Sequence, residues 1–238
     1  MPTTAKNPCR IVINLGNALL ASPLGTSGAK GISVDIAREW CRQSHCDSKF
    51  LIVQNAREAV TMLENKEADL GFLAVDPGRA EHLQFTRPYL NIDGCYLVKA
   101  NSSIIDNQQI DDASHRVVVG LGSAYDLYLS RHLKAAKLIK APSSKEVVDC
   151  FIREKADVAA GVKQQLENDM KPYKDLRLLQ EPFMQIQQAL VIHRDQGNAA
   201  LTQLQAFLNS YIRDGALAAS IKHHGVEGVT IASPQRQE

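Results

Sequence analysis

The sequence predicts an α/β fold built from two similar halves. Hydrophobic residues make up 45% and charged residues 22% of the 238 residues, which is typical of a globular protein. Short apolar runs alternate with segments whose apolar residues recur at helical spacing, a pattern typical of mostly parallel sheets covered by helices. The order strand–helix–strand–helix–strand occurs twice, and the third strand of each half follows a similar acidic element, NKEADLGFLAV or REKADVAAGV. We therefore expect two lobes rather than one large sheet.

The first half begins with a short apolar strand, which is followed by a loop rich in Gly, Ser and Pro from Gly16 to Gly31. Apolar residues in VDIAREWCRQ and REAVTMLENKEA recur at helical spacing. The run LGFLAV is fully apolar and ends at the turn signal Asp76-Pro77-Gly78. The pattern predicts strands at residues 10–14, 49–54, 70–75 and 95–100, and helices at 34–43 and 57–68.

The second half repeats the pattern and then adds two C-terminal helices. One helix is expected to start from Ser143 or Ser144 as its N-cap, with Glu146 in its first turn. No exact repeat of 33 to 40 residues is present, which argues against a solenoid. The pattern predicts strands at residues 116–120, 137–141, 157–161, 176–179 and 187–193, and helices at 123–133, 143–155, 162–170, 199–214 and 216–224.

Charge and composition limit the classes of binding partner and the cellular compartment that we expect for this protein. Lys and Arg total 27 and Asp and Glu total 26, so no global basic excess favours nucleic acid or an anionic membrane. The first apolar run, residues 11–13, is too short for the core of an export signal. Five cysteines at irregular spacing do not form a disulfide framework. These features favour a cytoplasmic protein; the alternative is a periplasmic protein whose leader has been removed.

A metal site is not expected. The fragment CRQSHC places Cys41, His45 and Cys46 close together, but structural zinc sites need a second ligand pair further along the chain. Ser-His-Asp and Cys-His arrangements at recognisable spacing are also missing, so the sequence predicts neither a cofactor nor a catalytic residue.

Several motifs together resemble the extracellular solute-binding protein family 3, the amino-acid-binding type II periplasmic binding proteins. In the first half the motifs are GISVD (31–35), LENKEAD (63–69), DPGR (76–79) and FTRPY (85–89). The second half adds VVVGLGSAYDLYL and ADVAAGVKQQ. The resemblance covers about residues 10–228. Each motif alone is weak evidence, but the combination is specific.

The resemblance implies two α/β lobes, each a mostly parallel sheet flanked by helices, joined by two hinge strands. Lobe 1 is expected at residues 1–97 plus 190–238 and lobe 2 at 98–189. It also implies a monomer that closes a cleft on a small carboxylate-bearing ligand and delivers it to an ABC permease. A cytoplasmic enzyme of the dehydratase or lyase type and a ligand sensor, both on the same fold, are the alternatives. The missing catalytic motif favours the binding protein.

In lobe 1, the resemblance implies that Arg79 grips a ligand carboxylate, because a guanidinium offers a planar fork of N–H donors. Its position after a buried strand fits, since ligands of open α/β sheets lie at the carboxyl ends of strands. The alternative is a solvated loop arginine. Asn14 and Asn17 follow the first strand, and their amides suit a polar ligand tail.

In lobe 2, Gly122 and Ser123 lie between a strand and a helix. Ser123 is expected to cap the helix, and the exposed amides of such a helix start also suit an anion. Tyr125 is expected to close over the ligand. Lys163 either adds a second positive group to the cleft or lies on the plain surface.

Two positions depart from the amino-acid-binding pattern. Ala74 replaces a Thr whose hydroxyl holds the ligand's α-ammonium, and Val162 replaces the second-lobe Asp. Either the ligand lacks an α-amino group, or Asp76 and Asp126 take over its binding. Both have simpler explanations, since Asp76 suits a turn and an acid at Asp126 favours the helix dipole.

Overall fold

The computed structural model describes residues 8–26 and 28–232. Residues 1–7, Ser27 and residues 233–238, which belong to predicted lobe 1 and its Gly-rich loop, lie outside the described residues. The chain divides into two compact units. It passes from the first to the second after Tyr89 and returns after Gln187. The first unit comprises Met1–Tyr89, Gln188–Val226 and Ile231–Glu238, and the second comprises Leu90–Gln187 and Glu227–Thr230.

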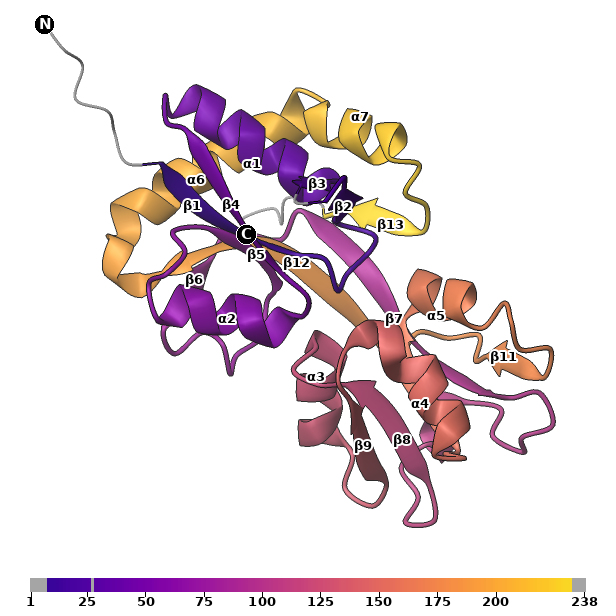
Figure 1. Ribbon diagram of the computed structural model, residues 1–238. Coiled ribbons are helices and arrows are strands. Elements are labelled where there is room, and N and C mark those ends of the chain that lie inside the picture. Colours follow the sequence, from indigo (N-terminus) through magenta and orange to yellow (C-terminus); the bar gives the residue numbers. More distant parts are fainter. Residues whose placement is uncertain (1–7, 27, 233–238) are drawn as a thin grey trace, which may run out of the picture. The chain divides into compact units, whose positions relative to one another are not determined.

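The first unit is built around strand β1 (Cys9–Asn14), which pairs in parallel with β4 (Ser48–Val53). Helix α1 (Ile32–Gln43) connects these strands, and α2 (Ala56–Glu64) leads on to β5 (Gly71–Ala74). A parallel bridge from Ile11 to Leu70 places the start of β5 on the other side of β1. The two helices lie on opposite sides of these strands (Figure 1), as right-handed crossovers in opposite directions require.

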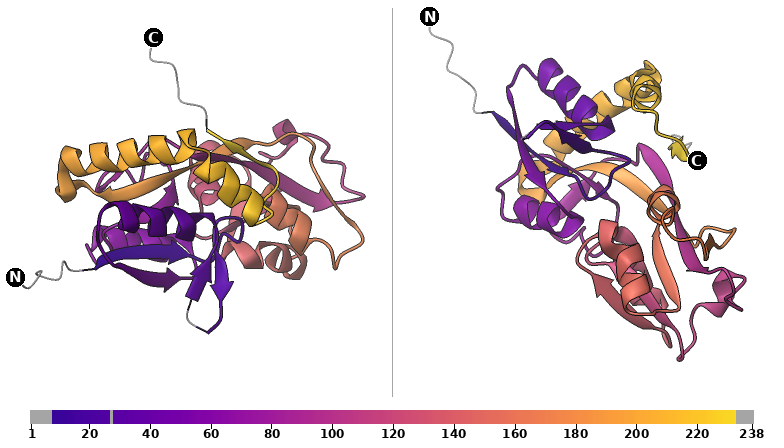
Figure 2. Two further views of the ribbon diagram at one scale, coloured as in Figure 1. Left: turned by 90° about the horizontal axis from the view of Figure 1, so that it is seen from above. Right: turned by 45° about the vertical axis from the view of Figure 1, so that its right-hand side comes forward.

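The C-terminal part of the chain completes the first unit with a further strand and two helices. Strand β12 (Met184–His193) runs antiparallel to β5 and also pairs with β6 (Leu83–Phe85). After the 3-10 turn η3 (Arg194–Gln196) come the helices α6 (Gly197–Arg213) and α7 (Ala216–His223). Helix α7 packs against α1, as Figure 2 also shows. The Ser220 hydroxyl donates to Asp35 at 2.6 Å.

The prediction of a loop from Gly16 to Gly31 is wrong in one respect, because this segment contains a small β-hairpin. Strands β2 (Ser22–Leu24) and β3 (Gly28–Lys30) pair antiparallel there. Three-residue strands are too short to show an alternating pattern, so the Gly and Ser residues of the turn dominated the prediction.

The second unit repeats the topology of the first. The strand β8 (Arg116–Gly120) pairs in parallel with β9 (Lys137–Ala141) on one side and β10 (Val158–Val162) on the other. Strand β7 (Leu90–Lys99) runs antiparallel to β10 and to β11 (Leu176–Leu178). The connections are η1 (Asn107–Gln109), α3 (Ala124–His132), η2 (Ser144–Glu146) with α4 (Val147–Arg153), and α5 (Lys163–Asp169), and β13 (Val229–Ile231) pairs with β7.

In both units the first strand lies between the second and the third, so the predicted two-fold repetition of strand–helix–strand–helix–strand is confirmed. The parallel strands are those joined by helices. The long strands β7 and β12, whose segments lead into and out of the second unit, run antiparallel to their neighbours. Each unit has its own core: Val12 and Leu63 belong to the first, and Val118, Phe151 and Leu166 to the second.

Candidate ligand-binding site

Arg79 is a buried cation at the end of β5. It is only 4% exposed, which excludes a solvated loop residue. Its Nη1 donates to the Ala74 carbonyl at 2.9 Å, and its backbone N–H donates to the Asp76 carbonyl at 3.1 Å. Burial lowers the pKa of the guanidinium to about 10, opposed by the nearby charge of Asp76. Arg79 therefore stays positively charged at neutral pH in a largely desolvated place.

Asp76 begins the turn that positions Arg79. The carboxylate is buried, and its Oδ1 accepts the Gly78 N–H at 2.8 Å. This is the local hydrogen bond by which Asp residues stabilise turns, as the sequence suggested.

Ala74 provides a buried methyl group where the resemblance expects a hydroxyl. The residue opposite Ala74 on the antiparallel strand β12 is Gln188, a buried amide, and directly opposed side chains lie on the same face of a sheet. Gln188 could not be found from the sequence, because it lies more than 100 residues away in a strand whose apolar residues dominate its pattern.

Asn14 and Asn17 shape the loop that follows β1. The Asn14 Oδ1 accepts the Gly16 N–H at 2.7 Å, and the Asn17 Oδ1 accepts the Leu19 N–H at 3.3 Å. Both side chains are partly exposed. Each amide oxygen thus supports a turn, and the predicted contact with a ligand tail stays a prediction.

The start of α3 has the cap that the sequence predicted. Gly122 has a φ of 71°, in the left-handed region that favours glycine. Ser123 is the N-cap, and its hydroxyl accepts the Asp126 N–H at 3.0 Å. The Asp126 carboxylate in turn accepts the Gly122 N–H at 2.8 Å. These reciprocal bonds fix the loop and hold the first turn of the helix in place.

Asp126 is almost completely buried, at 1% exposed. Besides Gly122 it accepts the Ser130 hydroxyl at 3.1 Å, and Lys140 of β9 approaches it at 3.2 Å. Lys140 could not be found from the sequence, because its alternation with Ile139 marks it only as an outward residue of a strand. These contacts connect α3 to β9, and they account for the burial of the Asp126 carboxylate by groups of the second unit alone.

Tyr125 is buried beneath the same loop. Its hydroxyl donates to the Ser144 hydroxyl at 2.8 Å, and burial raises its pKa. A Cβ added to Gly120 would lie only 2.7 Å from that hydroxyl oxygen, so the strand end and the tyrosine fit closely. The tyrosine supports the loop from within, and its predicted role over a ligand stays untested.

Lys163 is the first residue of α5 and is partly exposed. Burial raises the pKa of the neighbouring Cys95 thiol to about 11. The positive charge of Lys163 acts in the opposite direction and lowers that pKa. Because β8 and β10 are parallel neighbours, the segments that begin with Gly122 and Lys163 leave the same edge of the sheet.

The predicted residues thus form one group in each unit. In the first unit, Ala74 is the last residue of β5 and is followed by Asp76 and Arg79, while Asn14 is the last residue of β1 and is followed by Asn17. In the second unit, residues 122–126 form one turn, and Lys163 follows the adjacent strand. Each group lies where parallel strands end, the usual place for ligands of open α/β sheets.

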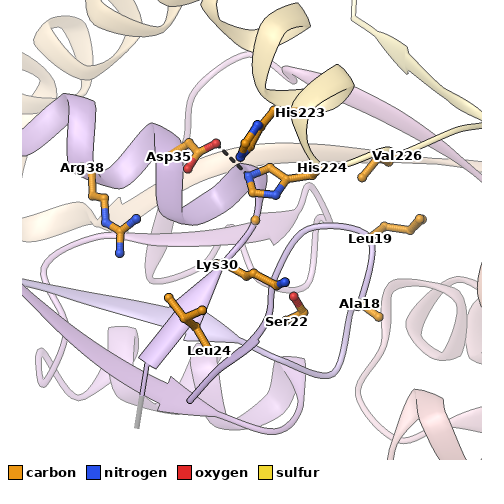
Figure 3. A pocket seen from close by; sticks show the side chains of 11 residues that line it. Ala18, Leu19, Ser22, Leu24, Lys30, Asp35, Arg38, His223, His224 and Val226 are labelled. Atoms are coloured by element: carbon orange, nitrogen blue, oxygen red, sulfur yellow. Dashed lines mark hydrogen bonds and ion pairs between the residues drawn. The ribbon is translucent and has the colours of Figure 1, made fainter. Parts of the chain in front are cut away.

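A separate hollow of about 460 Å³ lies in the first unit between the hairpin, α1 and α7 (Figure 3). Asp35 at its wall binds His224 Nε2 at 2.8 Å, and Lys30, Arg38 and His223 also line it. None of the predicted site residues lines this hollow.

Comparison with protein families shows which family the chain belongs to. The family model of bacterial extracellular solute-binding proteins, family 3, matches residues 22–227. The chain belongs to this family. An amino-acid-binding protein, AabA of Dichelobacter nodosus, is 28% identical over 174 residues, which cover 71% of this chain and 68% of that protein. The resemblance inferred from the motifs is confirmed, and so is a substrate-binding role.

Solved structures share the two-lobed type II fold. A histidine kinase sensor domain similar to periplasmic binding proteins has a TM-score of 0.81 at 14% identity, covering 97% of this chain and all 100% of that one. A putative ABC transporter binding component from Wolinella succinogenes, complexed with lysine, has a TM-score of 0.77 at 19% identity, covering 92% and 95%. A solute receptor for L-cysteine from Neisseria gonorrhoeae has a TM-score of 0.78 at 20% identity, covering 93% and 92%.

Two further properties concern residues 8–26 and 28–232. Within these ranges no helix is both long and apolar enough to cross a membrane. The same part of the chain contains no group of three or more His, Cys, Asp or Glu residues arranged to hold a metal ion.

Proposed function

We propose that this solute-binding protein serves an ABC-type importer and binds a small, polar, carboxylate-bearing ligand. The observation that carries the proposal is the buried guanidinium of Arg79 at the end of β5. Burying a cation costs free energy. An anionic ligand that binds beside the buried guanidinium, at the carboxyl ends of the strands, would offset this cost. A carboxylate matches the planar fork of an arginine with two parallel hydrogen bonds.

The start of α3 supports the same ligand chemistry. The N-terminus of a helix favours an anion through its amide N–H groups and its dipole. The left-handed Gly122 and the capping Ser123 fix the path of the backbone there. We propose that Arg79 and this loop contact the ligand together when the two lobes close, in a monomeric protein that delivers the ligand to a permease.

Ligand binding can be measured without knowing the ligand in advance. A thermal-shift screen of amino acids, keto acids, hydroxy acids and dicarboxylates would be followed by calorimetry on the best hit. A ligand at about 100 times its Kd stabilises the folded protein by roughly 2.7 kcal/mol. Arg79→Ala should weaken the hit by about 100-fold or more, because a charge-assisted pair contributes several kcal/mol. Mass spectrometry of the incubated ligand would reveal turnover.

Arg87 provides a matched control on the same segment, since it is an exposed arginine. Arg87→Ala should bind the hit as the wild type does. Circular dichroism of both variants must show the wild-type fold. If folded Arg79→Ala keeps full affinity, the proposed carboxylate clamp is wrong; conversion of the hit would instead identify an enzyme.

A further inference from the structure

The end of α1 places two cysteines side by side. After Gln43 the chain turns at Ser44 and His45, and His45 has a left-handed φ of 51°. The Cys46 N–H donates to the Cys41 carbonyl at 3.1 Å, and the His45 N–H donates to the Arg42 carbonyl at 3.4 Å. This pair of bonds is the Schellman cap, a motif in which the residues at the positions of Cys41 and Cys46 frequently make a side-chain contact.

A third cysteine reaches the same place from the sheet. Cys9 begins β1, and its N–H donates to the carbonyl of Asp47, the residue after Cys46, at 2.8 Å. The Cys41 thiol lies within hydrogen-bonding reach of the thiols of both Cys46 and Cys9. Cys41 is 4% exposed, whereas Cys9 and Cys46 are partly accessible.

The chemistry of this thiol cluster favours oxidation over metal binding. Burial, together with the neighbouring thiols, raises the pKa of Cys41 and that of Cys9, the latter to about 12. A bound metal needs thiolates that stay deprotonated, whereas thiol–disulfide exchange needs each thiolate only while it attacks. None of the described residues forms a set suited to a metal ion. A disulfide removes both protons and leaves no charge in the buried space.

We propose that Cys9, Cys41 and Cys46 form an oxidative modification site at which Cys41 and Cys46 become a disulfide across the helix cap. The oxidant is a low-molecular-weight disulfide such as oxidised glutathione. The accessible Cys46 sulfur, as thiolate, attacks it and releases one thiol; the Cys41 sulfur then attacks Cys46 and releases the second. Two cysteine thiols lose two protons and two electrons, and one disulfide is reduced to two thiols. Cys9 remains a thiol beside the new bond.

The test uses the full chain equilibrated with excess oxidised glutathione, unfolded, and alkylated with a maleimide. Intact mass should show three labelled thiols instead of five, with no glutathione attached. Because trypsin cleaves after Arg42, Cys41 and Cys46 lie on different peptides, and the disulfide should appear as one linked pair of peptides. The thermal midpoint should rise by several degrees and return to its initial value on reduction.

Two single substitutions separate this cap from general thiol oxidation. Cys46→Ser should abolish both the linked peptides and the rise in midpoint. Cys150→Ser, in the core of the second unit, should retain both. Five labelled thiols in the wild type, a lasting mixed disulfide with glutathione, or a bond that involves Cys95 or Cys150 would each overturn the proposal.

Discussion

Replacing Asp126 with alanine is the sharpest test of how the second unit holds the loop before α3. Asp126 is 1% exposed, and its carboxylate accepts the N–H of Gly122 and the hydroxyl of Ser130, with Lys140 at 3.2 Å. Removing the carboxylate leaves three groups without this acceptor. We therefore expect Asp126→Ala to destabilise the fold and to loosen the start of α3.

The three contacts of the Asp126 carboxylate do not contribute equally to the free energy of unfolding. A hydrogen bond to a charged acceptor contributes about 1.5–3 kcal/mol, and this applies best to the Gly122 N–H. Ser130 is exposed and can bind water instead. Lys140 is 46% exposed, so its ion pair is discounted to about 0–1 kcal/mol. Together these contacts predict a loss of about 2–4 kcal/mol in the free energy of unfolding. For a chain of this size that corresponds to roughly 5–15 °C in midpoint.

Two optical probes can locate the effect. The single tryptophan, Trp40, packs edge-on against Phe207 in the first unit, with ring centroids 5.2 Å apart. Trp40 fluorescence therefore reports unfolding of the first unit, whereas far-UV circular dichroism reports both units. If the units unfold separately, the loss should appear by circular dichroism in urea while the fluorescence transition keeps its midpoint.

Lys140→Ala is the matched control, because it removes the ion pair but leaves the carboxylate with its N–H and hydroxyl donors. It should cost less than about 1 kcal/mol. A loss below about 0.5 kcal/mol for Asp126→Ala, or equal losses for both variants, would refute this reasoning.

Two other substitutions test single contacts. Burial raises the pKa of Asp69, but the hydrogen bonds from Arg10 outweigh it and hold that pKa below 3.8. Asp69→Asn should therefore cost about 1 kcal/mol in urea unfolding at neutral pH, and this difference from the wild type should shrink as the pH falls below 3.8 through the folded-state pKa. Gly122→Ala should cost about 1 kcal/mol, as should Gly25→Ala, because both glycines have a positive φ. Only Gly122→Ala should weaken ligand binding in calorimetry, so equal affinities would argue against the anion-binding loop.

The fold was predictable because its signals are local and repeated. The apolar run RVVVG coincides with β8, since strands buried by helices on both faces need continuous apolar residues. KLIKA coincides with β9, the last strand in the sheet order, where Lys137 and Lys140 are exposed. The hairpin β2–β3 was not predictable, because its strands have three residues each and only one buried side chain, Ala29.

The site was predictable only in part, because its positions are set by long-range pairing. The turn at Asp76 and the cap at Ser123 follow from nearby residues, and both appear as expected. Gln188 faces Ala74, and Lys140 reaches Asp126, only because the strands pair in one register. Similarly, the contact of Cys9 with Cys41 depends on the register of β1 with β4, which spacing along the chain does not reveal.

For the proposed site, the described charges predict tighter binding of a carboxylate than of an ammonium group. Asp76 and Asp126 were the candidates to replace the missing hydroxyl at Ala74, but each carboxylate already accepts a backbone N–H. A carboxylate engaged in this way offers less to a cation, whereas Arg79 offers a charge to an anion. We therefore expect a keto or hydroxy acid to bind at least as tightly as the amino acid with the same side chain. Ala74→Thr should shift the ratio toward the amino acid by roughly tenfold, the effect of about 1.4 kcal/mol from one hydrogen bond to a charged group. Calorimetry of the matched pair decides the point: if the wild type prefers the amino acid by tenfold or more, another group holds the ammonium.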